Sequence, residues 1–376
     1  MNNKSISIFI SGDFAATSRV TDAINVGDYQ SLFNDAISVI KESDIAITNL
    51  EFPLIDNGLP IAKTGPNCKS PIKSIEAIKF AGFDMVTMAN NHMMDYGEEG
   101  LLSSIQLCEK NGIRHIGAGN NIVEAKRIVY FDVKEKRIAF INCCENEWST
   151  TYGETSGCNP LDEVSLFYQI QEAKSTADYV ILIIHGGHEM YEYPSPRMKK
   201  LYRWFVDLGV DAVIGHHTHC YSGNEIYKGK PIVYSLGNFI FDSNRRGSIW
   251  NMGCAVVLYL DDNSCDVRFY PYRQCDNEIG VHLLKGEDLN KWQDENKEKT
   301  LIIQNDILLE KQLSSFIETK EKDYLDRLEP FTSRIAQWAL RKGLLPRFIN
   351  NLKRRSYLNL IRAESHRDVL LRVLSK

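Results

Sequence analysis

The sequence predicts an α/β domain built around a core sheet, followed by a helical C-terminal appendage. Over most of the chain, short apolar runs rich in β-branched residues alternate with segments of helical spacing, which is typical of α/β domains. From about residue 281 the segments become charged and poor in β-formers, and helical patterns then continue to the end. We therefore expect a sheet domain over residues 1–280 and a basic helical extension over 281–376.

The expected strands are apolar runs that end in loops containing Gly, Asn, Asp or Pro. The segments that contain them are 5–13, 44–53, 83–97, 113–119, 127–133, 137–144, 178–187, 210–219, 230–242 and 253–262. The expected helices carry apolar residues three or four positions apart. They lie at 28–43, 71–82, 97–112, 166–177 and 195–209. Gly82 and Gly112 close two of these helices, as suits a helix C-terminus.

Composition places limits on the class of protein. The chain is 43% hydrophobic and 25% charged, as in ordinary globular proteins. It shows no cleavable leader and no apolar run of about 18 residues. Its nine cysteines include no CxxC pair, which favours a reducing compartment, so we expect a cytoplasmic protein. A net charge of -5, with no basic patch on the sheet domain, argues against nucleic acid as a partner.

The C-terminal extension differs in charge from the rest of the chain. Residues 331–376 contain eleven Lys or Arg and two Asp or Glu, although the whole chain is acidic. One interpretation is a helical cap whose basic face is solvated. The other is a contact with a membrane surface or an anionic polymer, which leaves membrane association open.

Polar clusters follow five of the expected strands. They comprise Asp13, Glu51, Asn91 with His92, His185, and the run His216, His217 and His219. Functional groups in α/β proteins collect at the carboxyl ends of strands. Carboxylate, amide and imidazole donors together are the set that Mn²⁺, Zn²⁺ or Fe prefers, whereas Ca²⁺ takes oxygens alone. The clusters therefore predict a metal site at one edge of the sheet.

The order of these motifs resembles a known family. NLEFP, ANNHMMDYGEEG, HGGHEMYEYPSP and GHHTH, followed by KPIVYSLGNFIFD, are similar to the CapA family of capsule and poly-γ-glutamate biosynthesis proteins. That family lies within the calcineurin-like metallophosphoesterases, and the resemblance covers about residues 5–245. It implies a four-layer α/β/β/α metallophosphoesterase-like sandwich that holds two divalent metal ions, Mn, Zn or Fe.

The resemblance also implies residue roles. Asp13 would bind the first metal, Glu51 would bridge both, and Asn91 and His185 would bind the second. Two histidines of the terminal GHHTH motif would each bind one of the metals. His92 would donate a proton to the leaving group, with Asp95 or another acid orienting it.

The run of three histidines allows two alignments. Matching the final His-x-His makes His217 and His219 the ligands, whereas matching Gly-His selects His216. Side chains alternate along an extended segment, so His217 and His219 should share a face. We favour that pair, and His216 then becomes a supporting or neutral residue near the substrate.

Further residues are expected to line the site. His188 and Glu189, on the loop after His185, are either solvated or in contact with substrate, and Glu192 shares that loop. Asn238 and Asp242 follow a strand and form either a turn or a wall of the site. The remaining assignments are Lys63 and Lys69 as cations for an anionic substrate, and Cys143 and Cys144 as core thiols.

Two functions remain open at this level. One is a metal-dependent hydrolase of an anionic ester or amide, with an anionic polymer or a phosphorylated or peptidyl small molecule as substrate. The other is a non-catalytic, metal-stabilised partner in polymer synthesis or export. Ala15 stands where many phosphoesterases have a histidine ligand, and Glu51 replaces an Asp. Both features agree with the CapA subset while weakening the case for phosphoesterase activity.

Overall fold

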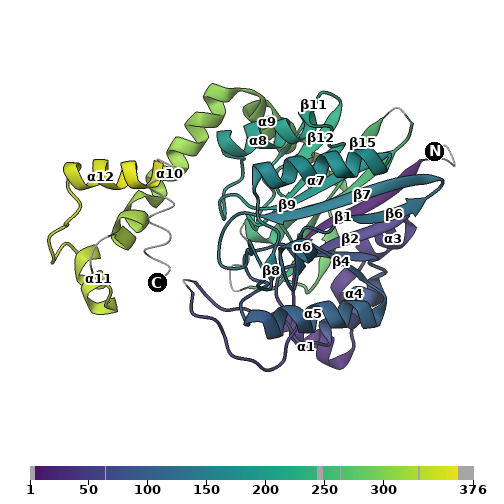
Figure 1. Ribbon diagram of the computed structural model, residues 1–376, viewed down its shortest axis with the longest axis horizontal. Helices are drawn as coiled ribbons and strands as arrows, with labels where there is room; N and C mark the ends of the chain where they lie inside the picture. The colour runs from purple at the N-terminus through teal and green to yellow at the C-terminus, as the bar shows by residue number, and fades with distance from the viewer. Residues whose placement is uncertain (1–4, 64, 244–248, 263, 329–330, 363–376) are drawn as a thin grey trace. The chain divides into compact units, whose positions relative to one another are not determined.

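The computed structural model describes residues 5–63, 65–243, 249–262, 264–328 and 331–362. Within them, the main architecture is a pair of packed sheets (Figure 1). The first sheet has the order β16-β15-β14-β1-β2-β3-β4, with β13 also pairing with β1. Its strands are β1 (Ile6–Ala15), β2 (Ile45–Leu50), β3 (Met85–Thr87), β4 (Arg114–Ile116), β13 (Asn238–Phe241), β14 (Met252–Leu260), β15 (Cys265–Gln274) and β16 (Val281–Leu283).

The second sheet has the order β11-β12-β10-β9-β7-β6. Its strands are β6 (Val129–Val133), β7 (Lys136–Cys144), β9 (Tyr179–His185), β10 (Ala212–His216), β11 (Asn224–Tyr227) and β12 (Lys230–Val233). A small ribbon joins β5 (Ala118–Gly119) to β8 (Gly157–Cys158). Strands β1, β2 and β3 are parallel, as are β7, β9 and β10, so each sheet gathers several carboxyl ends at one edge.

Helices cover the outer face of each sheet (Figure 1). The first sheet is covered by α1 (Ser18–Val26), α2 (Gln30–Phe33), α3 (Ala36–Glu42), α4 (Ser74–Ala81) and α5 (Gly97–Asn111). The second is covered by α7 (Glu163–Thr176), α8 (Pro196–Asp207) and the end of α9 (Gly286–Gln304). The remaining helices are α6 (Ile122–Ala125), α10 (Asp306–Leu328), α11 (Arg334–Arg341), α12 (Asn351–Arg362) and a 3₁₀ turn at Ile249–Asn251.

Strand periodicity produces the layers. Ile6, Ile8 and Ile10 of β1 belong to the core between the sheets, whereas the intervening Phe9 packs under the helices. Side chains alternate in this way because successive residues of a strand point to opposite faces. A third core fills the space between the second sheet and its helices. The expected α/β/β/α sandwich with a helical C-terminal region is therefore confirmed.

Two expected elements are each divided in the structure. The helix expected at 28–43 becomes α2 and α3, because Asn34 between them has a φ of 42°. The strand expected at 230–242 becomes β12 and β13, which belong to different sheets, and Gly237 between them has a φ of 72°. Strands β11, β15 and β16 and helix α1 were not expected from the sequence.

The chain forms two compact units, residues 1–310 and 311–376. The first unit extends past residue 280 and includes β16 and α9, because Trp292 packs between the sheets and Ile303 packs beneath α7 and α8. Among the helices that the structure describes, none is both long and apolar enough to cross a bilayer.

Gly12 permits a close contact that joins β13 to β1. A Cβ atom on Gly12 would lie 1.8 Å from the carbonyl oxygen of Gly237, and the backbone N–H of Asp13 donates to that same oxygen at 3.1 Å. A Gly12→Ala substitution should therefore destabilise the protein by about 1–3 kcal/mol, as overpacking does. Denaturant titration measures this change.

Gly153→Ala provides the matched control, because a Cβ atom there meets no heavy atom within 4 Å. The control should change the free energy of unfolding by less than about 0.5 kcal/mol. If both substitutions lowered the free energy of unfolding equally, the close contact with Gly237 would not be the reason that position 12 needs glycine.

Candidate metal centre

The predicted ligands come together where strands of the two sheets end. Asp13 lies near the end of β1, Glu51 directly follows β2, and Asn91 lies in the loop after β3. From the second sheet, His185 ends β9, and His217 and His219 follow β10. All six residues are buried. They form two groups that share Glu51.

The first group consists of Asp13, Glu51 and His219. One donor atom from each lies within 4.8 Å of the other two. The Oδ2 atom of Asp13 is 3.7 Å from Nδ1 of His219. This is a compact set of two carboxylates and one imidazole.

The second group is centred on His185. Its Nε2 atom is 3.1 Å from Oδ1 of Asn91 and 3.1 Å from Nδ1 of His217. Its Nδ1 atom faces Oε2 of Glu51 at 3.7 Å. Burial, followed by the neighbouring histidine His217, holds the pKa of His185 well below its usual value. The ring is therefore neutral and retains a nitrogen lone pair.

Asn49, which sequence reasoning missed, holds the two carboxylates in place. Its side-chain amide donates to Oδ1 of Asp13 at 2.8 Å and to Oε2 of Glu51 at 2.7 Å. The hydroxyl of Thr87 donates to the amide oxygen of Asn49 at 3.1 Å, which fixes the orientation of the amide. The only signal in the sequence was an Asn two positions before Glu51, a spacing that places two side chains on one face of an extended segment.

The carboxylates have strongly perturbed pKa values. Burial raises the pKa of Asp13 to about 7, against an opposing hydrogen bond from Asn49. Burial, together with repulsion from Asp13, raises the pKa of Glu51 well above its usual value. A low-dielectric site disfavours two adjacent negative charges, and a nearby cation reverses that preference.

Three buried atoms at this site, each able to ligate a metal, have no hydrogen-bond partner among the described residues. They are Oδ2 of Asp13, Oε1 of Glu51 and Nδ1 of His185. Buried polar atoms are nearly always paired, so atoms left without a hydrogen bond need an explanation such as a bound ion. Together they form a mixed oxygen and nitrogen donor set that suits a divalent transition metal.

The three terminal histidines differ in their surroundings. β10 ends at His216, and both His217 and His219 have a positive φ, of 95° and 57°. The segment is therefore not extended, and the alternation argument does not apply to it. His217 and His219 nevertheless lie among the other predicted ligands. His216 points between the sheets, where its Nε2 atom is 2.9 Å from the carbonyl oxygen of Ser11, and burial lowers its pKa to about 4.

Asn238 supports His219. Its Oδ1 atom is 3.0 Å from Nδ1 of His219, and its amide donates to the His219 carbonyl oxygen at 3.2 Å. The ring of Trp250 packs on His219 with a centroid distance of 4.7 Å. Asn238 is completely buried, so it positions a predicted ligand from behind.

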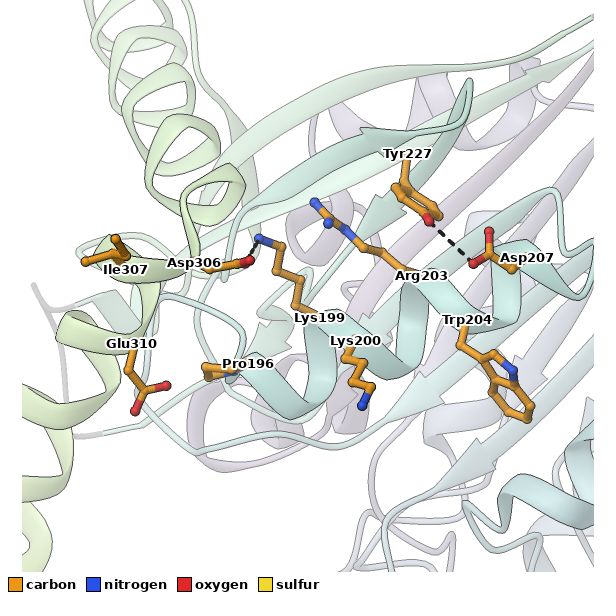
Figure 2. A pocket seen from close by; sticks show the side chains of 10 residues that line it. All are labelled: Pro196, Lys199, Lys200, Arg203, Trp204, Asp207, Tyr227, Asp306, Ile307 and Glu310. Atoms are coloured by element: carbon orange, nitrogen blue, oxygen red, sulfur yellow. Dashed lines mark hydrogen bonds and ion pairs between the residues drawn. The ribbon is translucent and has the colours of Figure 1, made fainter.

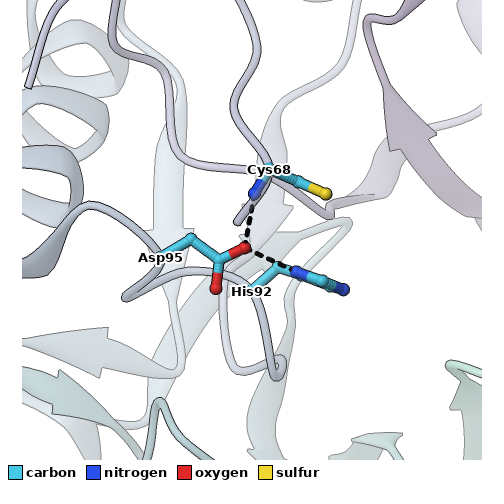
Figure 3. Close-up of side chains that lie close together, drawn as sticks. All are labelled: Cys68, His92 and Asp95. Carbon is cyan, nitrogen blue, oxygen red and sulfur yellow. Dashed lines mark hydrogen bonds and ion pairs between the residues drawn. The ribbon is translucent and has the colours of Figure 1, made fainter. Parts of the chain in front are cut away.

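Beside the ligands, His92 and Asp95 form a hydrogen-bonded pair (Figure 3). Nδ1 of His92 is 2.7 Å from Oδ2 of Asp95, and the backbone N–H of Cys68 donates to the same oxygen at 2.7 Å. The ammonium group of Lys63 contacts the other oxygen of Asp95, and the Lys63 side chain is only 3% exposed. Lys63 therefore balances the charge of Asp95 and is not a surface cation.

The other expected wall residues differ in their burial and in their partners. Glu189 is exposed and His188 is half-buried, with its ring 6.1 Å from that of Tyr191. Asp242 pairs with Arg19 at 2.7 Å, and Lys69 contacts the backbone oxygen of Asp56. Glu192 pairs with Lys299. Cys143 and Cys144 are buried, and their thiol pKa values are raised, Cys143 by burial and Cys144 first by the hydrogen bond that its thiol donates to Cys158.

A hollow of about 840 Å³ lies elsewhere on the first unit, and none of the predicted site residues lines it (Figure 2). It is bordered by α8, Tyr227 of β11 and the start of α10. Lys199 pairs with Asp306 at 2.6 Å, and Arg203 forms an ion pair with Glu225. Two of the cations that border the hollow are therefore already paired with acidic residues.

Comparison with known proteins finds bacterial capsule synthesis proteins. The family model for bacterial capsule synthesis protein PGA_cap matches residues 7–243, a range that contains every predicted ligand. Capsule biosynthesis protein CapA of Bacillus anthracis is 32% identical over 271 residues, covering 69% of this chain and 65% of that protein. PGA biosynthesis protein CapA of Bacillus subtilis (strain 168) is 32% identical over 233 residues, covering 61% and 60%.

The chain thus spans less than two thirds of the length of either relative. It is also similar in structure to a hypothetical protein from Thermus thermophilus, with a TM-score of 0.46 and 14% identity. That likeness covers 71% of this chain and 99% of the other.

Metal binding should depend on the ligand groups and not on His216. Changing Asp13, Glu51 or His217 to Ala should lower the affinity for Mn²⁺ or Zn²⁺ at least tenfold, because each removes a converging donor. Titration calorimetry and elemental analysis of the purified protein measure this loss. His216→Gln is the matched control and should keep the metal, because His216 bonds to Ser11. Full metal content in all three Ala variants would contradict the assignment.

The metal-free protein should lose stability as pH rises from about 4 to 7. Asp13 has a pKa of about 7 when folded, against 3.8 ordinarily, so in this window the folded state binds more protons than the unfolded state. Asp13→Asn should reduce that slope by up to about 1.4 kcal/mol per pH unit. Denaturant titrations in EDTA at several pH values measure it.

Asp132→Asn serves as the control for this slope, because its side chain is 78% exposed. The control should leave the slope unchanged. An Asp13→Asn slope equal to that of the parent protein would show that burial of Asp13 does not govern the pH dependence.

Proposed function

Because the chain belongs to the family of bacterial capsule synthesis proteins, we propose that its sandwich unit is a metal-dependent hydrolase that cleaves an anionic ester or amide in capsule or poly-γ-glutamate biosynthesis. One observation carries this proposal. Two buried carboxylates, held by Asn49, present Oδ2 of Asp13 and Oε1 of Glu51 without hydrogen-bond donors and beside the neutral imidazole of His185. Such an arrangement is costly unless cations compensate it.

The chain offers donors for two divalent cations. Asp13, Glu51 and His219 would hold one, while Asn91, His185 and His217 would hold the other with Glu51 between them. When bound, such cations supply a Lewis acid for the bond under attack and lower the pKa of a coordinated water. Neutral His185 suits this role, since only an uncharged imidazole can ligate a metal.

His92 is suited to move a proton at the edge of this site. An N–H at Nδ1 donates to Asp95, so the ring is held with Nε2 available for proton transfer. A protonated Nε2 would deliver its proton to the departing oxygen or nitrogen, while Asp95 stabilises the cationic ring. Asp95 itself is fixed by Lys63 and by the backbone N–H of Cys68.

A non-catalytic role is the second candidate, and one observation favours it. Ala15, two positions after Asp13, is fully buried and has no ligating atom where many phosphoesterases have a histidine. The first donor group therefore contains one imidazole fewer. A weakly held or absent first cation would leave a metal-stabilised partner protein for polymer synthesis or export.

Activity with added Mn²⁺ separates these candidates. The substrates to be tested are a phosphomonoester, a phosphodiester and poly-γ-glutamate. His92→Gln should reduce turnover of the responsive substrate about 10²- to 10⁴-fold, the usual effect of losing a general acid. Metal content should stay unchanged, because His92 is not among the ligands.

The control is His282→Gln, a half-buried histidine on β16 that should leave turnover unchanged. A protein that binds metal yet cleaves none of these substrates would favour the partner role. Turnover that survives His92→Gln unaltered would remove His92 from the mechanism while leaving the metal site standing.

A further inference from the structure

The second unit contains a strongly basic stretch at residues 331–354. It has six Lys or Arg and no Asp or Glu, on a chain whose net charge is -5. All six cations are exposed, and they are Arg334, Arg341, Lys342, Arg347, Lys353 and Arg354. This segment is therefore a local concentration of basic residues.

Large apolar side chains are exposed along the same stretch. Ile335 is 81% exposed, Trp338 is 56% exposed, Leu344 is 66% exposed and Leu352 is 71% exposed. Isolated exposed apolar residues are ordinary, but several within one short basic segment indicate an interaction surface. The basic residues do not explain why the apolar side chains are exposed. Binding to a partner that contacts both kinds of side chain would explain the two together.

Helix α11 places the two kinds of residue side by side. Ile335 and Trp338 are three positions apart on one side of the helix, and Arg334 and Arg341, four and three positions from Trp338, border that side. The helix ends at Arg341, Lys342 is its C-cap, and the Leu344 backbone N–H donates to the Ala339 carbonyl oxygen at 2.8 Å. The ring of Phe331 then contacts that of Phe348 at a centroid distance of 5.4 Å. The segment is thus a compact hairpin and not an extended basic tail.

We propose that residues 331–354 bind the surface of an anionic lipid bilayer, with Ile335 and Trp338 entering the headgroup region. An amphipathic helix with Lys and Arg beside Trp and Ile is the pattern of helices that lie in the membrane interface. A hydrophilic polyanion would need the cations alone and would leave the apolar face in water. The combination therefore favours lipid over an anionic polymer.

Vesicle flotation of the full chain tests this proposal. Vesicles of phosphatidylglycerol and phosphatidylcholine should bind the protein, and vesicles of phosphatidylcholine alone should bind it much more weakly. The double substitution Arg341→Gln and Lys342→Gln should weaken binding roughly 25-fold, at about fivefold per cation. The double substitution Ile335→Ser and Trp338→Ser should weaken it roughly tenfold or more, through lost apolar burial.

Controls come from the first unit. Leu301→Ser removes an apolar side chain that is 65% exposed, and Lys297→Gln removes a cation whose side chain is 74% exposed. Neither should change flotation, and thermal melts should show all variants folded. Absence of binding to anionic vesicles would overturn the proposal.

A second outcome would assign the segment to a polymer. If Ile335→Ser with Trp338→Ser left binding unchanged, and soluble poly-γ-glutamate bound with the same dependence on Arg341 and Lys342, lipid would be the wrong partner. Hydrolytic activity plays no part in this test, so its result is independent of the function proposed for the sandwich.

Discussion

The shared hydrogen bonding of Asp13 and Glu51 to Asn49 is the interaction on which the site depends. One amide group donates to both carboxylates, and both are completely buried. Removing two like charges from water costs several kcal/mol per ion, and a single amide cannot compensate for it. Protons or cations must supply the rest, and the neutral ring of His185 beside the pair favours cations. Thr87 matters for the same reason, because it determines which end of the amide faces the acids.

The two-sheet architecture explains how these groups meet. Asp13, Glu51 and Asn91 come from the first sheet, and His185, His217 and His219 from the second. Neither sheet alone carries both carboxylates and the histidines. The glycine contact between β1 and β13 adds Asn238, so the same backbone approach that pairs the strands also positions His219. The fold and the donor set are therefore coupled at a few backbone positions.

Much of this arrangement could be predicted from local patterns. Alternation such as Ile6, Ile8 and Ile10 predicts a strand with one face in a core, and a polar residue just after such a strand predicts a position at the sheet edge. Partners chosen by tertiary structure could not be predicted in this way. Lys63 was interpreted as a cation for an anionic substrate because nothing local shows that a loop returns it to Asp95. The turn after His216 was interpreted as extended because a positive φ at a histidine has no sequence signal.

The donor groups are unequal, and this bears on both candidate functions. The group around His185 offers two imidazoles and an amide oxygen in addition to Glu51, whereas the group around Asp13 offers one imidazole and two carboxylates. The difference in imidazole number is attributed to Ala15, because a histidine at that position would add an imidazole to the group around Asp13. Affinity for a given divalent metal depends on ligand number and type, so the two positions should fill at different metal concentrations. The proposed hydrolase would need both positions filled, while the proposed partner role would need only the tighter one, so the metal supply would decide between the two proposed roles.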